Sequence, residues 1–283
     1  MSDIIKAMVL GIVEGITEFL PISSTGHLVV GMELLGFRSD LQTTFGIFIQ
    51  IGALVAVLIY YARELFQQAQ TIHKDESVQR WWLAIVVAAL PALALGFFLA
   101  DTLNTFLRPS VVAVSMIVGG VIIYAAEMYQ VQRAPSPSLA TVPPTSVMTD
   151  LQDTEVSVLQ ALVIGLFQIL ALIPGMSRSA TSIIGGMFVG LPRPVATRFS
   201  FYLAIPVLGS ATTYSLIKAL STINSSDLLL LVIGAVVSGV VAWVMVAWLL
   251  RYVARHTFLP FAMYRIIVGI IILLLLAAAQ LQG

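Results

Sequence analysis

The sequence predicts an all-α integral membrane protein, an inverted-topology repeat with six transmembrane helices and two re-entrant helix-loop-helix hairpins. Composition is the first observation, because 59% of the 283 residues are hydrophobic and only 10% are charged, more apolar than a water-soluble chain of this length tolerates. Six uninterrupted apolar stretches are the second. Two further apolar regions, each interrupted by proline, serine and glycine, are the third. Together they predict a chain whose solvent is a lipid bilayer.

The six uninterrupted stretches are each close to the length of about 20 residues that a helix needs to span the hydrocarbon core. They lie at residues 43–62, 82–100, 111–129, 198–218, 228–250 and 260–281. We therefore predict one transmembrane helix for each stretch.

The two interrupted regions, residues 4–37 and 156–191, do not fit the rule for a single span. The first is broken by Pro21-Ile22-Ser23-Ser24-Thr25-Gly26-His27, and the second by Pro174-Gly175-Met176-Ser177-Arg178-Ser179. Irregular backbone at membrane depth needs protein or water around it. Short apolar pairs of this kind predict hairpins that enter and leave the membrane on the same face.

The distribution of lysine and arginine supports the hairpins over single crossings. With two hairpins, four cations lie on one side (Lys6, Arg38, Arg108 and Lys218) and eight on the other (Arg63, Lys74, Arg80, Arg133, Arg193, Arg198, Arg251 and Arg255). If each interrupted region crossed once, the same cations would divide six and six. Only the unequal split gives an orientation signal, since cytoplasmic loops carry the excess of positive charge. This predicts both termini and the mouth of the first hairpin outside the cytoplasm.

Residues 130–155 change in character and contain four of the twelve prolines, which predicts a solvated linker. The linker separates two halves, residues 1–129 and 156–283, within a single membrane domain. Each half contains one hairpin and three spans, an odd number of crossings, so the two halves have opposite orientation in the membrane. The hairpins would then enter from opposite faces and meet near the midplane.

Glu14 and Glu18 lie four residues apart in the first apolar segment. On a helix this spacing places both carboxylates on one face, where they repel each other. Among lipid tails an ionised side chain persists only beside a protein interior, a cation or a proton donor. The pair therefore predicts a partner for these carboxylates.

A meeting of the two hairpin tips would gather hydroxyls, helix-start backbone donors and one arginine, which suit an oxyanion and phosphate best. The gathered residues would be Glu14, Glu18, Ser23, Ser24, Thr25, His27, Ser177, Arg178, Ser179 and Thr181. A bound diphosphate beside two glutamates has too much negative charge for Arg178 alone. A divalent cation, Mg²⁺ or Ca²⁺, or one protonated glutamate would balance it. The formal net charge of zero argues against a nucleic-acid partner.

At these residues the chain resembles the bacterial undecaprenyl-diphosphate phosphatases, also called bacitracin-resistance proteins. The resemblance rests on Glu14-Gly15-Ile16-Thr17-Glu18-Phe19-Leu20-Pro21-Ile22-Ser23-Ser24-Thr25-Gly26-His27 and Pro174-Gly175-Met176-Ser177-Arg178-Ser179, with support from Phe199–Pro206 and Pro260–Arg265. It implies a multi-pass protein of the bacterial inner membrane that hydrolyses a C55 polyprenyl diphosphate to the monophosphate carrier used for peptidoglycan. It also implies dependence on a divalent cation and resistance to bacitracin. A homodimer stays open.

The resemblance also implies roles for individual residues. Glu14 and Glu18 would be the metal or acid-base glutamates, Ser23, Ser24 and Thr25 the hydroxyl cluster, and Arg178 the phosphate clamp, with Ser177 and Ser179 binding phosphate beside it. Our preferred hypothesis has Ser24 as the nucleophile, His27 as its general base, and Arg178 and a metal neutralising charge. Attack by His27 itself, or by water activated by either glutamate, stays open.

A secondary transporter or a lipid flippase is the rival interpretation, because inverted repeats, broken helices and intramembrane acids are also typical of transporters. Adjacent hydroxyls, a histidine and an opposing arginine favour phosphoryl transfer instead. Arg265, inside the final predicted span, would either pair with a carboxylate or reach the site.

Overall fold

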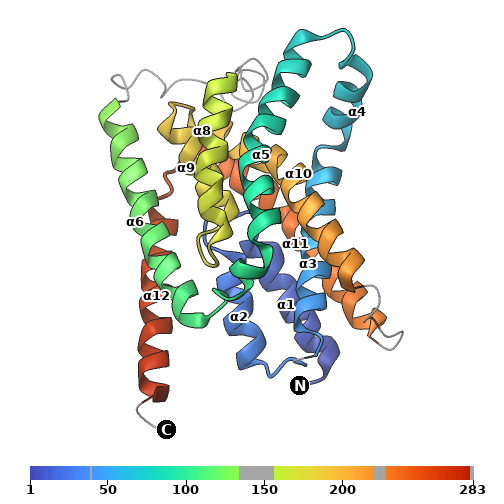
Figure 1. Ribbon diagram of the computed structural model, residues 1–283, viewed down its shortest axis with the longest axis vertical. Coiled ribbons are helices and arrows are strands. Elements are labelled where there is room, and N and C mark those ends of the chain that lie inside the picture. The colour runs from blue at the N-terminus through green and yellow to red at the C-terminus, as the bar shows by residue number, and fades with distance from the viewer. Residues whose placement is uncertain (39, 134–155, 220–222, 224–226, 281–283) are drawn as a thin grey trace.

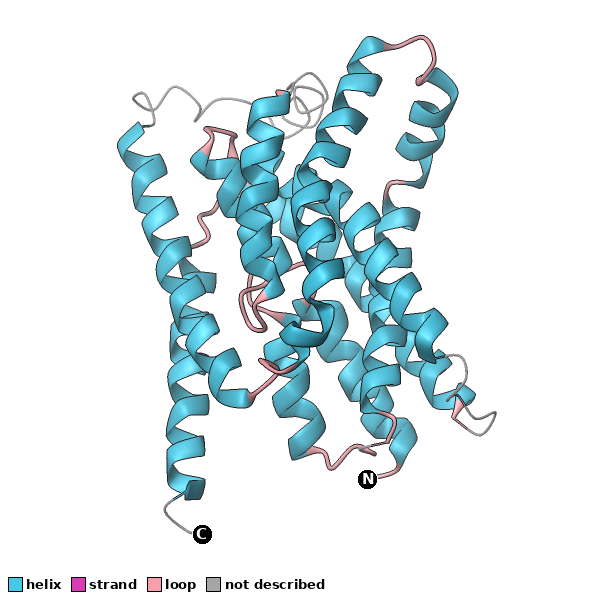
Figure 2. Ribbon diagram, viewed as in Figure 1, coloured by secondary structure: helices cyan, strands magenta, loops and turns pink. Residues whose placement is uncertain are grey.

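The computed structural model describes residues 1–38, 40–133, 156–219, 223 and 227–280, and in this part of the chain every regular element is a helix (Figures 1 and 2). Six long helices are α3 (Gln42–Tyr60), α5 (Glu76–Asn104), α6 (Pro109–Arg133), α10 (Arg193–Ala219), α11 (Leu228–Val253) and α12 (Leu259–Gln280). All six are long and apolar enough to cross a membrane, which confirms the predicted spans. A short helix, α4 (Ala62–Thr71), follows α3 and was not predicted.

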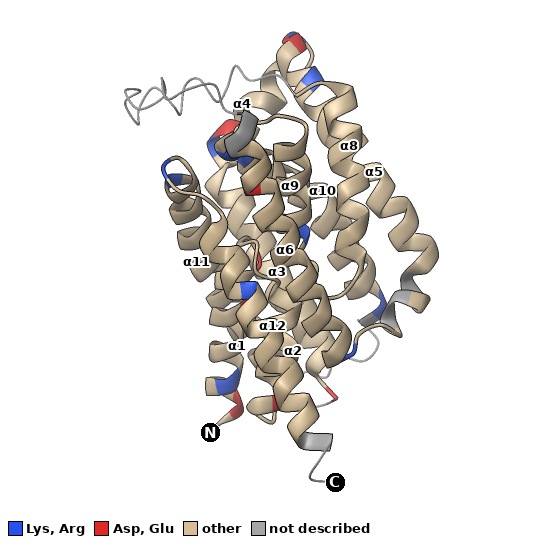
Figure 3. Ribbon diagram, turned by 90° about the vertical axis from the view of Figure 1, so that its left-hand side faces the viewer, with Lys and Arg blue, Asp and Glu red and all other residues tan. Residues whose placement is uncertain are grey.

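The surface of the helix bundle suits a lipid environment. Large apolar side chains stay exposed on the long helices, among them Leu90 on α5 and Val240 on α11. Most charged residues lie at the two ends of the bundle rather than around its middle (Figure 3). A band of exposed apolar side chains between two charged ends is the arrangement that a bilayer selects.

Two helical hairpins complete the fold. The first pairs α1 (Asp3–Thr17) with α2 (Ser24–Leu34), and the second pairs α8 (Val158–Ile169), extended by the 3₁₀ turn η2 (Leu170–Leu172), with α9 (Arg178–Phe188). In Figure 1 α1 starts at the end of the molecule that holds both termini, and α8 starts at the opposite end. The two tips meet between these ends. The re-entrant path of each hairpin through a bilayer stays a prediction.

The two hairpins correspond residue by residue at their second helices. Both α2 and α9 have 11 residues and begin directly after a serine cap, Ser23 or Ser177. This correspondence agrees with the inverted repeat, whose assignment to residues 1–129 and 156–283 stays a prediction. The predicted linker begins later than expected, because α6 continues to Arg133, and residues 134–155 lie outside the described part of the chain.

Close helix contact fixes the first hairpin against α11. A Cβ atom added at Gly11 would lie 2.7 Å from the carbonyl oxygen of Gly234, and one at Gly15 would lie 2.7 Å from that of Ser238. Only a residue without a side chain permits this approach, which is typical of helix interfaces in membranes. The face of α1 that carries Glu14 is therefore held against the protein interior rather than lipid.

Candidate active site

The structure brings the two hairpin tips into direct contact. The Ser179 hydroxyl donates to the carbonyl oxygen of Leu20 at 2.8 Å. Arg178 Nη2 lies 3.5 Å from Glu18 Oε1, and both side chains are buried. The two tips therefore meet, through one hydrogen bond from a side chain to a backbone oxygen and one ion pair.

Ser23 and Ser177 shape the tips through their backbone. They are the only non-glycine residues with positive φ in the described part of the chain, at 73° and 72°. Each side chain accepts a hydrogen bond from the backbone N–H of the third residue after it, Gly26 or Ala180. A left-handed conformation costs a non-glycine residue about 1–2 kcal/mol, and such strain gathers at functional sites.

The strained caps place Ser24 and Arg178 at equivalent positions, as the first residues of α2 and α9. The N-terminus of each helix presents unpaired backbone N–H groups and the positive end of the helix dipole. Two such ends converge where the tips meet. The convergence favours an anion between Ser24 and Arg178.

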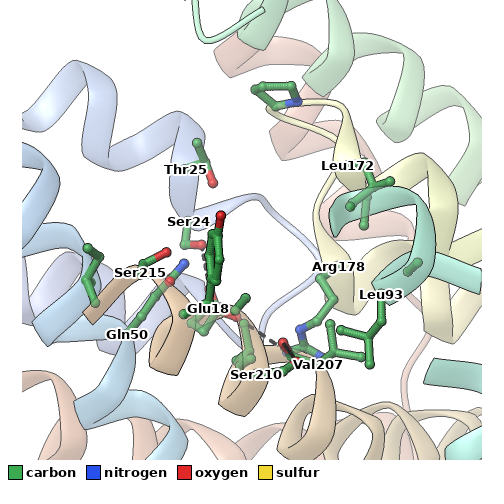
Figure 4. Close-up of a pocket in the computed structure, with 18 of the residues that line it drawn as sticks. Glu18, Ser24, Thr25, Gln50, Leu93, Leu172, Arg178, Val207, Ser210 and Ser215 are labelled. Atoms are coloured by element: carbon green, nitrogen blue, oxygen red, sulfur yellow. Dashed lines mark hydrogen bonds and ion pairs between the residues drawn. The ribbon is translucent and has the colours of Figure 1, made fainter. Parts of the chain in front are cut away.

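Ser24 is hydrogen-bonded to a carboxylate rather than to the histidine. Its hydroxyl donates to Glu18 Oε2 at 2.6 Å, and both residues line the cavity in Figure 4. Glu18 Oε1 faces Arg178 on its other side. The carboxylate is thus in hydrogen-bond reach of the Ser24 proton, which is the first requirement for a general base.

His27 faces away from Ser24. Its Nδ1 is 2.7 Å from the carbonyl oxygen of Ser23, and its Nε2 is 2.6 Å from the hydroxyl of Tyr264 on α12. The ring does not line the cavity. The predicted pairing of Ser24 with His27 is therefore not formed, because both imidazole nitrogens are used in fastening α2 to its own cap and to α12.

The cavity at the tips has a volume of about 1040 Å³. Polar side chains of both tips line it, and further polar side chains come from the surrounding helices. Those of the tips are Glu18, Ser23, Ser24, Thr25, Ser177 and Arg178. Its apolar lining comes mainly from α3, α5, α10 and the turn η2: Ile47, Leu93, Phe97, Leu172, Val207 and Leu208. A few convergent polar groups within apolar walls are typical of small-molecule sites, and here they suit an anionic head group on an apolar chain.

Two hydroxyls predicted to bind an anion serve the scaffold instead. Ser179 is fully buried and lies 3.0 Å from the Ser177 hydroxyl as well as bonding to the tip of the first hairpin. Thr181 donates to the carbonyl oxygen of Arg178. Neither residue lines the cavity, whereas Ser23, Thr25 and Ser177 do.

Glu14 is fully buried, and neither carboxylate oxygen has a hydrogen-bond partner. It does not line the cavity, although it lies one helical turn from Glu18. Among the described residues no three acidic, histidine or cysteine side chains form a ready metal cluster. A buried carboxylate without a partner is costly unless it gains a proton or a cation, so Glu14 fits either one.

Arg265 ties the site together from α12. The side chain is fully buried and donates to five carbonyl oxygens. These belong to Pro21 in the first tip, Gly175 and Met176 in the second tip, and Ser115 and Met116 on α6. Arg265 therefore neither pairs with a carboxylate nor lines the cavity, but binds the backbone of both tips.

Sequence reasoning gave no role to several polar residues of the cavity wall, among them Gln50 on α3 and Gln168 on α8. Neutral amides within apolar stretches give no charge signal. For Gln168 a signal existed in the repeat, because it stands as far before Ser177 as Glu14 stands before Ser23.

Comparison with known proteins covers nearly the whole chain. A family model described as bacitracin resistance protein BacA matches residues 7–271. The chain is 45% identical to a Deinococcus radiodurans protein named undecaprenyl-diphosphatase, with 99% of this chain and 98% of that protein aligned. A protein of the same name from a Polaromonas species is 44% identical, over 95% and 94% of the two chains. Undecaprenyl-diphosphatase 1 of Burkholderia lata is 44% identical, over 96% and 95%. The matches include both hairpin tips.

Proposed function

The chain belongs to the bacitracin resistance protein BacA family, and we propose that it carries out the reaction of its relatives with the side chains of the two hairpin tips. It is an integral membrane phosphatase that hydrolyses undecaprenyl diphosphate to undecaprenyl phosphate and inorganic phosphate. This reaction recycles the lipid carrier for cell-wall synthesis and confers resistance to bacitracin. The observation that carries our assignment of residues is the hydrogen bond from Ser24 to Glu18 beside Arg178.

In this assignment Ser24 is the nucleophile and Glu18 its general base. The Ser24 oxygen attacks the terminal phosphorus while Glu18 accepts the hydroxyl proton. The bond from that phosphorus to the bridging oxygen breaks, undecaprenyl phosphate leaves, and a serine phosphomonoester remains. Glu18 passes its proton to the departing phosphate group and is ionised again. Water then attacks the phosphoserine and gives a proton to Glu18. The bond from phosphorus to the Ser24 oxygen breaks, inorganic phosphate leaves, and Glu18 returns the proton to Ser24.

Arg178 and the two helix N-termini stabilise the negative charge that develops on the transferred phosphoryl group. Arg178 is already held in place, because its Nη1 donates to the carbonyl oxygen of Ser200 at 3.0 Å. His27 keeps the first tip in position through Ser23 and Tyr264.

Glu14 and Glu18 would hold a divalent cation, Mg²⁺ or Ca²⁺. The two unpartnered oxygens of Glu14 support this assignment, since they lack a counter-charge. When bound, the cation would offset the charge of the diphosphate and polarise its oxygens. Chelation should abolish phosphate release, and readdition of the metal should restore it. Full activity in the chelator would contradict the assignment.

The cavity also suits the lipid part of the substrate. Its wall continues from the tips along α10 to Tyr214 and Lys218, and it includes Asp40. The C-terminal end of α10 lies towards the end of the molecule that holds both termini (Figure 1), which carries the smaller share of cations in the predicted topology. We expect this end to face away from the cytoplasm of a bacterial inner membrane, so that the head group enters from the outer leaflet.

Phosphate release from undecaprenyl diphosphate by the purified protein in detergent tests the assignment. Ser24→Ala should lower kcat by at least about a thousandfold, the scale on which nucleophiles and their bases act. Ser210→Ala is the matched control, since Ser210 also lines the cavity but bonds to its own helix at Pro206. Acid quenching should trap phosphate on Ser24, and a parallel quench in base, which preserves a phosphorus–nitrogen bond, should find none on His27. Phosphate on His27, or an active Ser24→Ala protein, would overturn the serine mechanism.

A transporter without hydrolysis is not favoured. It would accumulate the polyprenyl diphosphate across vesicles without releasing phosphate. Transport alone does not explain why a nucleophile, a carboxylate and an arginine are adjacent. Reversible binding of a substrate requires no hydroxyl that is hydrogen-bonded to a base.

A further inference from the structure

Gln168 has a buried side-chain amide that forms no hydrogen bond within the described part of the chain. Its side chain on α8 is fully buried, and neither Nε2 nor Oε1 has a partner. It nevertheless belongs to the wall of the cavity that contains Ser24 and Arg178. An unpaired buried amide costs free energy, so native structures keep one where a ligand completes its hydrogen bonds.

The repeat places Gln168 at a meaningful position. It precedes the cap Ser177 by the same interval that separates Glu14 from the cap Ser23. Both side chains are fully buried and unpartnered, but only Gln168 reaches the cavity wall. An amide at this position can donate to an anion, whereas a carboxylate would repel it.

A second free donor lies on the same hairpin. Arg178 uses Nη1 for Ser200 and Nη2 for Glu18, while its Nε is buried without a partner. Arg178 and Gln168 both line the cavity. The second hairpin therefore offers two unused N–H donors, one charged and one neutral, to whatever enters.

We propose that Gln168 is a diphosphate-binding residue, whose side-chain N–H donates to a phosphate oxygen of the substrate next to the Arg178 Nε–H. The first hairpin supplies the nucleophile and the general base, and the second supplies the donors that bind the diphosphate. This inference rests on the proposed function, because it places the diphosphate in the same cavity. It adds a residue that binds the head group without reacting with it.

Binding measured without turnover tests this role. In a Ser24→Ala background, farnesyl diphosphate serves as the probe, and its dissociation constant is measured in detergent. Gln168→Leu should weaken binding about tenfold to a hundredfold, the range for a hydrogen bond to a charged group. Gln168→Glu, nearly identical in shape, should weaken it at least as much. Gln70→Leu, at an exposed amide on α4 outside the cavity, should leave it unchanged.

Thermal unfolding separates a binding role from a structural one. Because Gln168→Leu removes an unpaired buried amide, the ligand-free melting temperature should stay the same or rise by a few degrees. A fall of several degrees, or unchanged affinity in either Gln168 variant, would overturn the proposal. Residual turnover in the Ser24→Ala protein would instead count against the proposed nucleophile, since the binding comparison does not depend on that step.

Discussion

The two hairpins have similar backbone conformations but carry side chains of different chemical character. At equivalent positions, the first has Ser24 and Glu14 and the second has Arg178 and Gln168. Serine and glutamate suit attack and proton transfer, whereas arginine and an amide suit the binding of an anion. Since the tips meet, Ser24, Arg178 and Gln168 line one cavity, whereas Glu14 lies behind its wall. In the proposed function the two copies of the motif divide the work, one reacting with the phosphoryl group and the other binding it.

The largest effect should come from removing the base on the first hairpin. Glu18→Gln keeps the shape but loses the proton acceptor and the charge beside Arg178, so kcat should fall by about a hundredfold to ten-thousandfold. Phosphate release measures it. Glu33→Gln is the control, because Glu33 is an exposed acid on α2. Equal activity of the two variants would contradict the role of Glu18.

Separating the hairpins should have the next largest effect. Arg265→Met leaves five carbonyl oxygens without their donor, which should lower stability by about 3–5 kcal/mol and the melting temperature by roughly 10 °C. Arg265→Lys, with three donors, should have a melting temperature between those of the unchanged protein and Arg265→Met. Arg251→Met, at an exposed arginine, serves as control. An unchanged melting temperature in Arg265→Met would show that the tips hold each other without it.

The role of His27 sharpens the comparison. Substitution of a general base lowers kcat far more than substitution of a residue that only positions the first hairpin. Its contacts with Ser23 and Tyr264 indicate fastening, so His27→Gln should lower kcat by less than about tenfold. Tyr264→Phe should have a similar effect. A loss of a thousandfold in His27→Gln alone would restore the histidine as general base.

The smallest effect tests the equivalence of the two caps. Ser23→Ala and Ser177→Ala each lose one cap hydrogen bond and keep a positive φ, so each should cost about 1 kcal/mol. Ser177→Ala also removes the contact with the Ser179 hydroxyl, but Ser179 keeps its hydrogen bond to Leu20. Thermal unfolding should show nearly equal shifts of about 2–4 °C. Strongly unequal shifts would indicate that the tips differ in stability as well as in chemistry.

Much of the fold followed from the sequence, because length and hydropathy specify a span directly. The interruptions at Pro21 and Pro174 located both tips, and the odd number of crossings predicted that they meet. The partner of Ser24 did not follow. It depends on the left-handed backbone of Ser23, which the identity of a serine does not reveal.

The buried cation and the buried amide could not be assigned from sequence for another reason. A cation such as Arg265 within an apolar span requires a partner, but its partners are backbone carbonyl oxygens, which every residue possesses. The Gln168 side chain has no hydrogen-bond partner among the described residues. Both assignments needed three-dimensional coordinates.

The contacts of Arg265 have a consequence for how this protein family can vary. A guanidinium that grips only main-chain oxygens places no demand on the side chains of Ser115, Met116 or Met176. Substitution at those positions leaves the accepting oxygens in place as long as the backbone keeps its path, although Met116 is constrained separately because its side chain is buried in the apolar core. Gly175 is the exception, since its φ of 96° and its Cβ position, 2.5 Å from a neighbouring carbonyl oxygen, exclude a larger residue.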